Sequence, residues 1–442
     1  MSSLGRMGAE VLLPDSPDYE LARRAAIPRF QDVRPQAVAR CHTAADVADA
    51  IALARRDGLP VAVRSGGHCF AGRSSTDGLV IDVRPMRSVF VSSALVTVGA
   101  GARLGEIYDE LDGQGLTIPA GCGPDVGISG LTLGGGLGIL GRSHGLTSDH
   151  LLMAQVVLAD GSVVECDEHH DEELFWALRG AGGAGFGVVT TLVFGTLPAP
   201  DATSFHLEWP RTEAAALLKA WQDWSPAAPD ELAASLLVKP GGAHLIGAML
   251  GGESDTANLL DQLVARAGAD PQSAVLRHAS YREAKRRLAE IGDETAEGAE
   301  EGHPFIRSEF FRQPLPGDAV AALVEHFYED TATGQSRELD LTPWGGAYNR
   351  IRPEATAFAH RDERFLLKQA VVVDPGADSE DARRWLERSW ELAHPWGSGG
   401  VYPNFPEPDL DRWAEAYWGG NRERLLKVKA AYDPDGVFSS TR

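Results

Sequence analysis

Residues 64–72 read RSGGHCFAG and directly follow the apolar run LPVAV at residues 59–63. A short β-branched run that ends in glycine is typical of a buried strand entering a tight turn. Gly66 and Gly67 permit positive φ, so successive backbone N–H groups can converge on an anion, of which phosphate is the natural example. His68 stands at the edge of this turn. Taken alone, the stretch is explained equally well by a tight turn with an incidental histidine.

A second glycine-rich stretch, PAGCGPDVGISGLTLGGGLG, occupies residues 119–138. Glycine inside regular structure costs roughly 0.5–1 kcal/mol per residue relative to alanine. Close approach of the backbone to a large flat ligand would explain that cost, and glycine-mediated packing is the alternative. Together with residues 64–72, this stretch favours a bound, phosphate-containing ligand.

The composition describes an ordinary globular protein and excludes some partners. The chain has 442 residues, of which 43% are hydrophobic and 24% charged, with a net charge of −22. At about 150 residues per domain, this length allows about three domains or one large composite. Such an acidic chain disfavours binding to nucleic acid or to anionic membranes, so neither is an expected partner.

Hydrophobic periodicity divides the chain near Pro198. Before it, short strands and helices alternate. After it, the pattern of helices and strands indicates a second α+β region. We predict helices at residues 44–58, 102–115, 171–180, 213–224, 256–268, 281–292 and 421–432, strands at 59–67, 79–85, 94–101, 186–197, 244–252 and 364–373, and a hairpin at 151–166.

Several familiar motifs can be discarded. Gly180–Gly185 fits G-x-G-x-x-G, but a helix precedes it and a strand follows, the reverse of a dinucleotide-binding Rossmann unit. The sequence has no P-loop, no nucleophile elbow and no H-E-x-x-H. The pair His169–His170 lies among acidic residues and is interpreted as a surface loop. We therefore expect no metal site.

The cysteines and the N-terminus indicate a reducing compartment. Cys41, Cys69, Cys122 and Cys166 form no C-x-x-C pair, and a chain of this size does not need disulfides for stability. There is no apolar stretch typical of a signal peptide, and no uncharged run reaches the about 18 residues of a membrane-spanning helix. We expect a cytoplasmic protein without a membrane partner.

Six segments occur in the order found in one family. They are RSGGHCFAG, GCGPDVGISGLTLGGGLGILGRSHGLTSDHL, GAGFGVVT, WGGAYNRIRPEATAFAHR, YPNF and YWGGNRERLLKVKAAYDPDGVF. From about residue 30 to the C-terminus the chain resembles the berberine-bridge-enzyme-like FAD-linked oxidoreductases of the vanillyl-alcohol-oxidase/para-cresol-methylhydroxylase flavoprotein superfamily. The resemblance implies an α+β fold: a two-piece, non-Rossmann FAD-binding domain (residues 1–200, completed by a C-terminal return at 396–442) with an inserted antiparallel-sheet substrate domain (201–395).

The resemblance also implies a covalent cofactor. In family members the histidine at the position of His68 is bonded to the 8α-methyl carbon of FAD. The backbone around it would wrap the pyrophosphate, the second glycine-rich stretch would lie along the isoalloxazine and ribityl chain, and a third segment would touch the adenosine. The residues implied to bind FAD are His68, Arg64, Ser65, Gly66, Gly67, Cys69, Gly121, Cys122, Val126, Gly127, Ser129, Gly130, Gly187, Val189, Tyr402 and Asn404.

The chain departs from the family at the second flavin attachment. Many members carry a further covalent link through a cysteine, and the matching position here is Gly123, with Cys122 one residue early. A one-residue shift usually turns a side chain away from its target. We therefore predict attachment through His68 alone, with Cys122 as a packed thiol near the ring.

The second departure concerns the catalytic base. Phe405 occupies the place of a tyrosine that takes the substrate proton in several members, and the strand at 364–373 has no carboxylate where others carry glutamate. The remaining candidates are Tyr402, Tyr348 and, less favoured, Glu309 or Lys368. We select Tyr402, with Asn404 and Gln369 orienting the substrate. Because the usual tyrosine pKa is about 10, this role requires a nearby cation or hydrogen bond.

These features predict an FAD-dependent oxidase that takes a hydride from a C–H bond next to oxygen or nitrogen and reduces O2 to hydrogen peroxide. The substrate would be a small molecule such as an alcohol, an amine, a sugar or an intermediate of secondary metabolism. Two alternatives remain. One is a dehydrogenase that uses another electron acceptor. The other is a flavin-binding protein with little turnover, which the missing tyrosine and carboxylate keep open.

Overall fold

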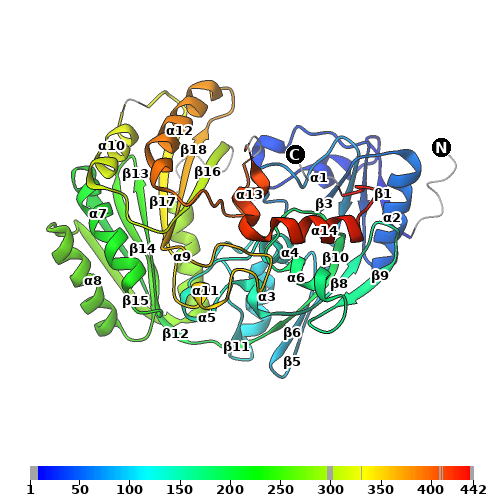
Figure 1. Ribbon diagram of the computed structural model, residues 1–442, viewed down its shortest axis with the longest axis horizontal. Helices are drawn as coiled ribbons and strands as arrows, with labels where there is room; N and C mark the ends of the chain where they lie inside the picture. Colours follow the sequence, from blue (N-terminus) through cyan, green and yellow to red (C-terminus); the bar gives the residue numbers. More distant parts are fainter. Residues whose placement is uncertain (1–7, 296–301, 330, 408–409, 411, 439–442) are drawn as a thin grey trace.

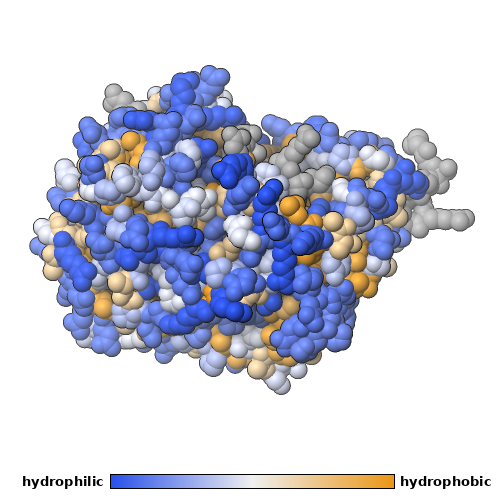
Figure 2. Space-filling view, in the orientation of Figure 1, coloured by the Kyte–Doolittle hydropathy of each residue, from blue (hydrophilic) through white to orange (hydrophobic). Residues whose placement is uncertain are grey.

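The computed structural model describes residues 8–295, 302–329, 331–407, 410 and 412–438, and it shows two lobes side by side (Figure 1). The predicted segment 1–200 therefore lacks a description of residues 1–7, and the predicted segment 396–442 lacks one of residues 439–442. Hydrophilic residues cover most of the face seen in Figure 2. Among the described helices, none combines the length and the apolar character that crossing a membrane requires.

The first lobe contains two sheets with helices packed around them. One sheet has the order β1-β2-β4-β3, in which β2, β4 and β3 run parallel, and the other has the antiparallel order β5-β6-β10-β8-β9. The strands are β1 (Glu10–Leu12), β2 (Ala37–Arg40), β3 (Val61–Arg64), β4 (Leu79–Asp82), β5 (Val89–Ser92), β6 (Leu95–Gly99), β8 (Leu151–Val157), β9 (Val163–Cys166) and β10 (Val188–Gly195).

The helix α2 (Ala44–Asp57) begins and ends at caps that the sequence supplies. It starts at a capping box between Thr43 and Asp46 and ends at Gly58, in the left-handed conformation. The other helices are α1 (Tyr19–Arg23), α3 (Leu104–Asp112), α4 (Ile128–Leu133), α5 (Gly141–His144) and α6 (Glu172–Leu178), and the short strands β7 (Leu116–Thr117) and β11 (Leu197–Pro198) pair with each other.

The second lobe is built on one fully antiparallel seven-stranded sheet of order β15-β12-β14-β13-β17-β18-β16. Four helices pack on one face, and α9 covers part of the other face, toward the first lobe (Figure 1). The strands are β12 (Asp201–Pro210), β13 (Leu232–Lys239), β14 (Gly242–Leu250), β15 (Ser273–Ser280), β16 (His303–Phe311), β17 (Gln335–Pro343) and β18 (Phe365–Val373); the helices are α7 (Ala214–Trp224), α8 (Glu253–Ala267), α9 (Tyr281–Thr295), α10 (Gly317–Phe327) and α12 (Ser379–Ala393).

Strand alternation decides which side chains of this sheet face the first lobe. On β18, Phe365 and Leu367 pack into the core beneath the four helices. Leu366 points the other way, into a cluster with Tyr402 and Phe358 of the connecting segments. Successive side chains of a strand alternate in this manner, so the even-numbered residues of β18 form part of the surface turned toward the first lobe.

The last part of the chain returns to the first lobe after the short helix α11 (Ala347–Arg350) and α12. There α13 (Trp413–Trp418) and α14 (Arg422–Tyr432) complete it, with α14 packed on α6. Arg424 of α14 pairs with Glu173 of α6 at 2.7 Å. The predicted α+β class with an antiparallel second sheet is confirmed.

Candidate active site

A cavity of about 540 Å³ lies in the first lobe where three glycine-rich loops meet the returning segment at residues 402–406. This volume is within the usual range of about 300–1,000 Å³ for small-molecule sites. Of the residues implied to bind FAD, those that line the cavity are Ser65, Gly66, Gly67, His68, Cys69, Gly121, Val126, Gly127, Ser129, Gly130, Gly187, Val189, Tyr402 and Asn404.

The two glycine-rich stretches of the sequence touch each other backbone to backbone. A Cβ placed on Gly66 would lie 2.4 Å from the Gly127 nitrogen, and one on Gly127 would lie 2.3 Å from the Gly66 nitrogen. At Gly130, by contrast, a Cβ would meet nothing within 4 Å, although the residue lines the cavity. Glycine-mediated packing therefore explains Gly66 and Gly127, and the open space at Gly130 leaves room for a ligand.

Two serines fasten these stretches to the same carbonyl group. Ser65 Oγ and Ser129 Oγ donate hydrogen bonds to the Ala100 carbonyl oxygen, at 2.8 and 2.6 Å. Both serines line the cavity, and Ala100 is buried directly after β6. The part of the cavity wall that contains these two serines is therefore held in place by hydrogen bonds within the protein, without a ligand.

His68 presents an imidazole suited to act as a nucleophile. Burial lowers the pKa of the His68 ring, and the Asp125 carboxylate and backbone carbonyl only partly oppose that shift. Asp125 is held by Arg103 at 2.7 Å. A ring with a lowered pKa is neutral at physiological pH and keeps a lone pair available for bonding to carbon.

Arg73 and Ser74 add a cation and a hydroxyl group to the residues that line the cavity. A guanidinium is well matched to phosphate. The residues present thus fit the phosphates of FAD. The sequence analysis missed Arg73, although it lies five residues after His68 in the same loop.

Tyr402 is the candidate base that lines the cavity, and its hydroxyl oxygen accepts three hydrogen bonds. The donors are the backbone nitrogens of Gly136 and Leu137, at 3.2 and 3.1 Å, and Asn404 Nδ2, at 3.2 Å. Burial raises the pKa of Tyr402 to about 12 despite these donors. Asn404 is itself positioned by donating to the Leu131 carbonyl at 2.9 Å.

The wall beside Tyr402 is aromatic, with a cation behind it. The ring of Phe405 packs edge-on against those of Tyr402 and Phe70, with centroids 5.1 and 6.0 Å away. Lys368 Nζ, on the sheet surface turned toward the first lobe, lies 5.5 Å from the Phe405 ring centroid. Lys368 pairs with Glu338 and Asp340 at 3.0 and 3.1 Å, which fixes its position.

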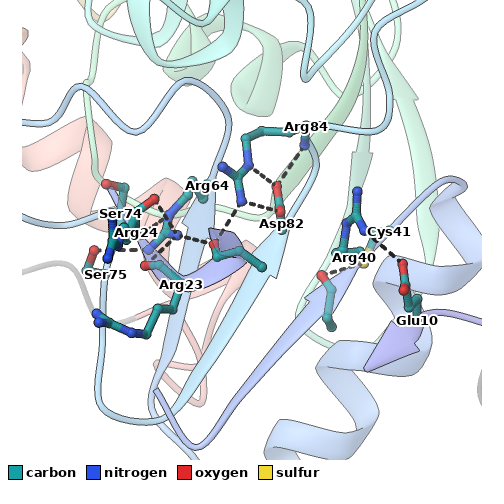
Figure 3. A network of polar contacts seen from close by, with 12 residues as sticks. Glu10, Arg23, Arg24, Arg40, Cys41, Arg64, Ser74, Ser75, Asp82 and Arg84 are labelled. Atoms are coloured by element: carbon teal, nitrogen blue, oxygen red, sulfur yellow. Dashed lines mark hydrogen bonds and ion pairs between the residues drawn. The ribbon is translucent and has the colours of Figure 1, made fainter. Parts of the chain in front are cut away.

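The side chain of Arg64, whose backbone is predicted to help wrap the pyrophosphate, points away from the cavity. It is 1% exposed and donates to the carbonyls of Ala22 and Arg23, both at 2.8 Å, and of Ser74, at 3.0 Å (Figure 3). The residue belongs to β3 and lies outside the cavity lining. Arg64 instead connects the 22–24 segment to the loop that carries Ser74.

Gln369, which is predicted to orient the substrate, does not face the cavity. Gln369 is an odd-numbered residue of β18, so it faces the helices, where its Oε1 accepts a hydrogen bond from Ser389 of α12 at 2.5 Å. It is 1% exposed and does not line the cavity. The sheet itself therefore separates Gln369 from the site.

The other candidates also lie outside the cavity lining. Cys122 packs beside the hydrophobic cluster of Ile139 and Tyr281, and burial raises its thiol pKa. Tyr348 is 2% exposed and donates to the Gly138 carbonyl at 3.2 Å. Glu309 faces the helix side of the sheet, where His394 lies 3.0 Å away.

Comparisons with known proteins agree with this geometry. A family model described as "FAD binding domain" matches residues 35–167, and one described as "Berberine and berberine like" matches residues 401–442. The chain is 32% identical to the FAD-linked oxidoreductase YgaK of Bacillus subtilis, over 98% of this chain and 96% of that protein. It is 31% identical to a chitooligosaccharide oxidase of Gibberella zeae, over 91% and 86%.

A solved structure extends the agreement to three dimensions. The structure is of a glucooligosaccharide oxidase from Acremonium strictum, described as having a 6-S-cysteinyl, 8α-N1-histidyl FAD. It matches with a TM-score of 0.88 and 27% identity, over 97% of this chain and 95% of that one.

Proposed function

Because the chain belongs to the berberine-bridge-like family of FAD-linked oxidoreductases, we propose that it is an oxidase that carries FAD on His68. Its reaction would remove a hydride from a C–H bond next to oxygen or nitrogen of a small organic substrate. The observation that carries the proposal is that His68, Tyr402, Arg73 and Ser74 line one cavity.

His68 would hold the cofactor through a single bond. Its neutral ring supports bonding to the 8α carbon, and Gly123 at the position of the second attachment supports a single link. When bound, FAD accepts the hydride and delivers two electrons to O2, which gives hydrogen peroxide. Arg73 and Ser74 would hold its phosphates.

Tyr402 would accept the proton that the substrate loses together with the hydride, after its own phenolic proton has left to solvent. Removing hydride from an alcohol carbon leaves a carbonyl only if the hydroxyl proton also departs. The two backbone N–H groups and Asn404 Nδ2 that already point at the Tyr402 oxygen would stabilise the phenolate. They are hydrogen bonds of the kind that the sequence analysis required, but they offset only part of the effect of burial, which raises the pKa of Tyr402 to about 12.

We propose a hydroxylated, sugar-like substrate. Polar side chains lie on the sheet surface turned toward the first lobe: Lys239 pairs with Glu338 at 3.0 Å, and Glu338 and Asp340 pair with Lys368. Such a row supplies donors and acceptors for hydroxyl groups. The names of the chito-, gluco- and xylooligosaccharide oxidases among the relatives, at 30–32% identity, support the same class.

The position of the cavity supports an assignment of flavin binding and substrate binding to different parts of the chain. We propose that residues 1–200 and 396–442 hold the flavin and that residues 201–395 face the substrate. The cavity lining comes from residues 61–189 and 402–438, and the strands of the seven-stranded sheet come from residues 201–373.

The test is anaerobic mixing with a panel of sugars, other alcohols and amines, followed by flavin absorbance. We expect bleaching by a hydroxylated substrate, then reoxidation in air within seconds with formation of hydrogen peroxide. Reduced flavin that persists for minutes in air would identify a dehydrogenase. Absence of bleaching across the panel would favour a flavin-binding protein with little turnover.

A further inference from the structure

Three potential metal ligands converge on the substrate sheet, away from the flavin cavity. His206 and Glu208 lie two residues apart on β12, and His244 lies on β14. Glu208 and His244 are directly opposed in the strand register, which places His206 on the diagonal. Phe205 and Leu207 pack into the core under the helices, so all three ligands lie on the opposite face of the sheet.

The spacing of the three groups matches a small divalent ion. His206 Nε2 lies 3.1 Å from His244 Nδ1 and 3.7 Å from Glu208 Oε1, and the three ligand atoms lie within 4.8 Å of one another. In a tetrahedral zinc site with bonds of about 2.0–2.1 Å, neighbouring ligand atoms are about 3.3 Å apart. The observed separations bracket that value.

The surroundings leave one side of the group accessible. The side chain of His206 is 14% exposed and that of Glu208 is 42% exposed. Lys239 is the nearby cation that acts on His244, and its charge is paired with Glu338 at 3.0 Å. Two imidazoles and one carboxylate suit zinc and similar transition metals, and three protein ligands leave a fourth position open.

We propose that His206, Glu208 and His244 bind one divalent transition-metal ion of the zinc class. An imidazole–imidazole hydrogen bond explains the 3.1 Å contact, and the strand register adds a carboxylate oxygen 3.7 Å from the same His206 nitrogen, which completes a three-ligand set. The sequence signal is a histidine and a glutamate at i and i+2 on one strand. The third ligand comes 36 residues after Glu208, so the pattern is not recognisable without the strand pairing.

The strand register places this site at a distance from the flavin. His244 is opposite Leu237, Leu237 is opposite Asp340, and Asp340 is opposite Lys368. At about 4.8 Å per strand, the site is roughly 14 Å from Lys368, the residue beside Phe405. An ion there cannot reach the oxidised carbon, so its open position takes water or an oxygen atom of a bound molecule. The proposal does not depend on turnover.

The test is isothermal titration of Zn²⁺ into the FAD-loaded full-length chain. We expect one ion per chain for the wild type and at least about tenfold weaker binding for His244→Ala and for Glu208→Gln, with the flavin spectrum unchanged as a check of folding. The matched control is His278→Ala. His278 lies opposite Thr203 on the face of the same sheet that the helices cover, so this variant should bind Zn²⁺ as the wild type does.

Two results would overturn the proposal. One is a wild-type chain that takes up no Zn²⁺. The other is binding that survives both His244→Ala and Glu208→Gln but is lost in the double variant His169→Ala/His170→Ala, which would place the ion at the exposed pair beside Asp167.

Discussion

Tyr402 shows how two opposing effects act on one hydroxyl group. At 1% exposure the phenolate loses hydration, while three N–H groups point at its oxygen. Burial dominates, so the pKa of Tyr402 is raised to about 12 and the resting side chain is a phenol. The donors are nevertheless in place to stabilise the phenolate, which must form by loss of the phenolic proton to solvent before Tyr402 can accept a proton from the substrate.

Replacing this hydroxyl tests its role. For Tyr402→Phe we expect flavin reduction by substrate to slow by about 10²–10⁴-fold, the usual contribution of a positioned acid–base group. Flavin content should not change, because the ring still packs against Phe405. The measurement is anaerobic stopped-flow absorbance.

Tyr348 provides the control for that experiment. It is buried in the same aromatic cluster but does not line the cavity. Tyr348→Phe should reduce flavin at close to the wild-type rate. If Tyr402→Phe is as fast as the wild type, the proton is accepted elsewhere.

At the scale of elements, a buried ion pair joins two segments around the site. Arg361, 0% exposed, donates to both carboxylate oxygens of Asp149, at 2.9 and 2.7 Å. Asp149 lies between α5 and β8, and Arg361 lies between α11 and β18. The pair thus connects the segment that leads into β8 with the segment that leads into β18.

Removing one partner of this buried ion pair should destabilise the folded protein. We expect Asp149→Asn to lower the free energy of unfolding by about 3–5 kcal/mol, because Arg361 is left as a buried, unpaired charge. Urea denaturation monitored by tryptophan fluorescence measures the change. Glu173→Gln, which breaks the exposed pair with Arg424, is the control, with a loss of no more than about 1 kcal/mol. Equal losses for the two variants would contradict this account.

A second contact between elements joins Lys285 of α9 to the loop beside the cavity. Lys285 Nζ donates to the Ala120 carbonyl at 2.8 Å and lies 3.5 Å from the Tyr108 ring centroid. Tyr108 in turn donates to the Gly121 carbonyl at 2.6 Å. The loop that carries Gly121 is therefore held from both lobes.

The Lys285 contact predicts a pH dependence of stability. Burial lowers the pKa of Lys285 to about 7, while the unfolded chain keeps this proton up to about pH 10. Between these values the unfolded state binds more protons, so this residue makes stability rise with pH, by at most about 1.4 kcal/mol per unit. The difference in unfolding free energy between wild type and Lys285→Met should therefore grow from pH 7 to 9 in favour of the wild type. A difference that is constant with pH would contradict the shift.

At the scale of the whole molecule, the sequence predicted the architecture because its signals are local. The helix of residues 44–58 and the hairpin of residues 151–166 each carry their own caps or turn. The glycine stretches at 64–72 and 119–138 pointed to a ligand region because glycine lets the backbone approach a ligand closely. Such features need no knowledge of distant contacts.

What the sequence could not predict depends on distant partners. The run FLLKQAVVV is buried on both faces, so it has no alternation from which to place Gln369 on the helix side. The carbonyl groups that accept from Arg64 come from residues 22–24. The convergence of His206 with His244 depends on pairing between β12 and β14.

The central claim is that His68 alone tethers FAD in a glycine-lined cavity. The most direct measurement is proteolysis of fully active, acid-denatured enzyme, followed by mass spectrometry of the peptide that contains His68. We predict that this peptide carries the flavin, that the peptide containing Cys122 is unmodified, and that His68→Ala releases its flavin into the acid supernatant. An unmodified His68 peptide from fully active enzyme would contradict the claim.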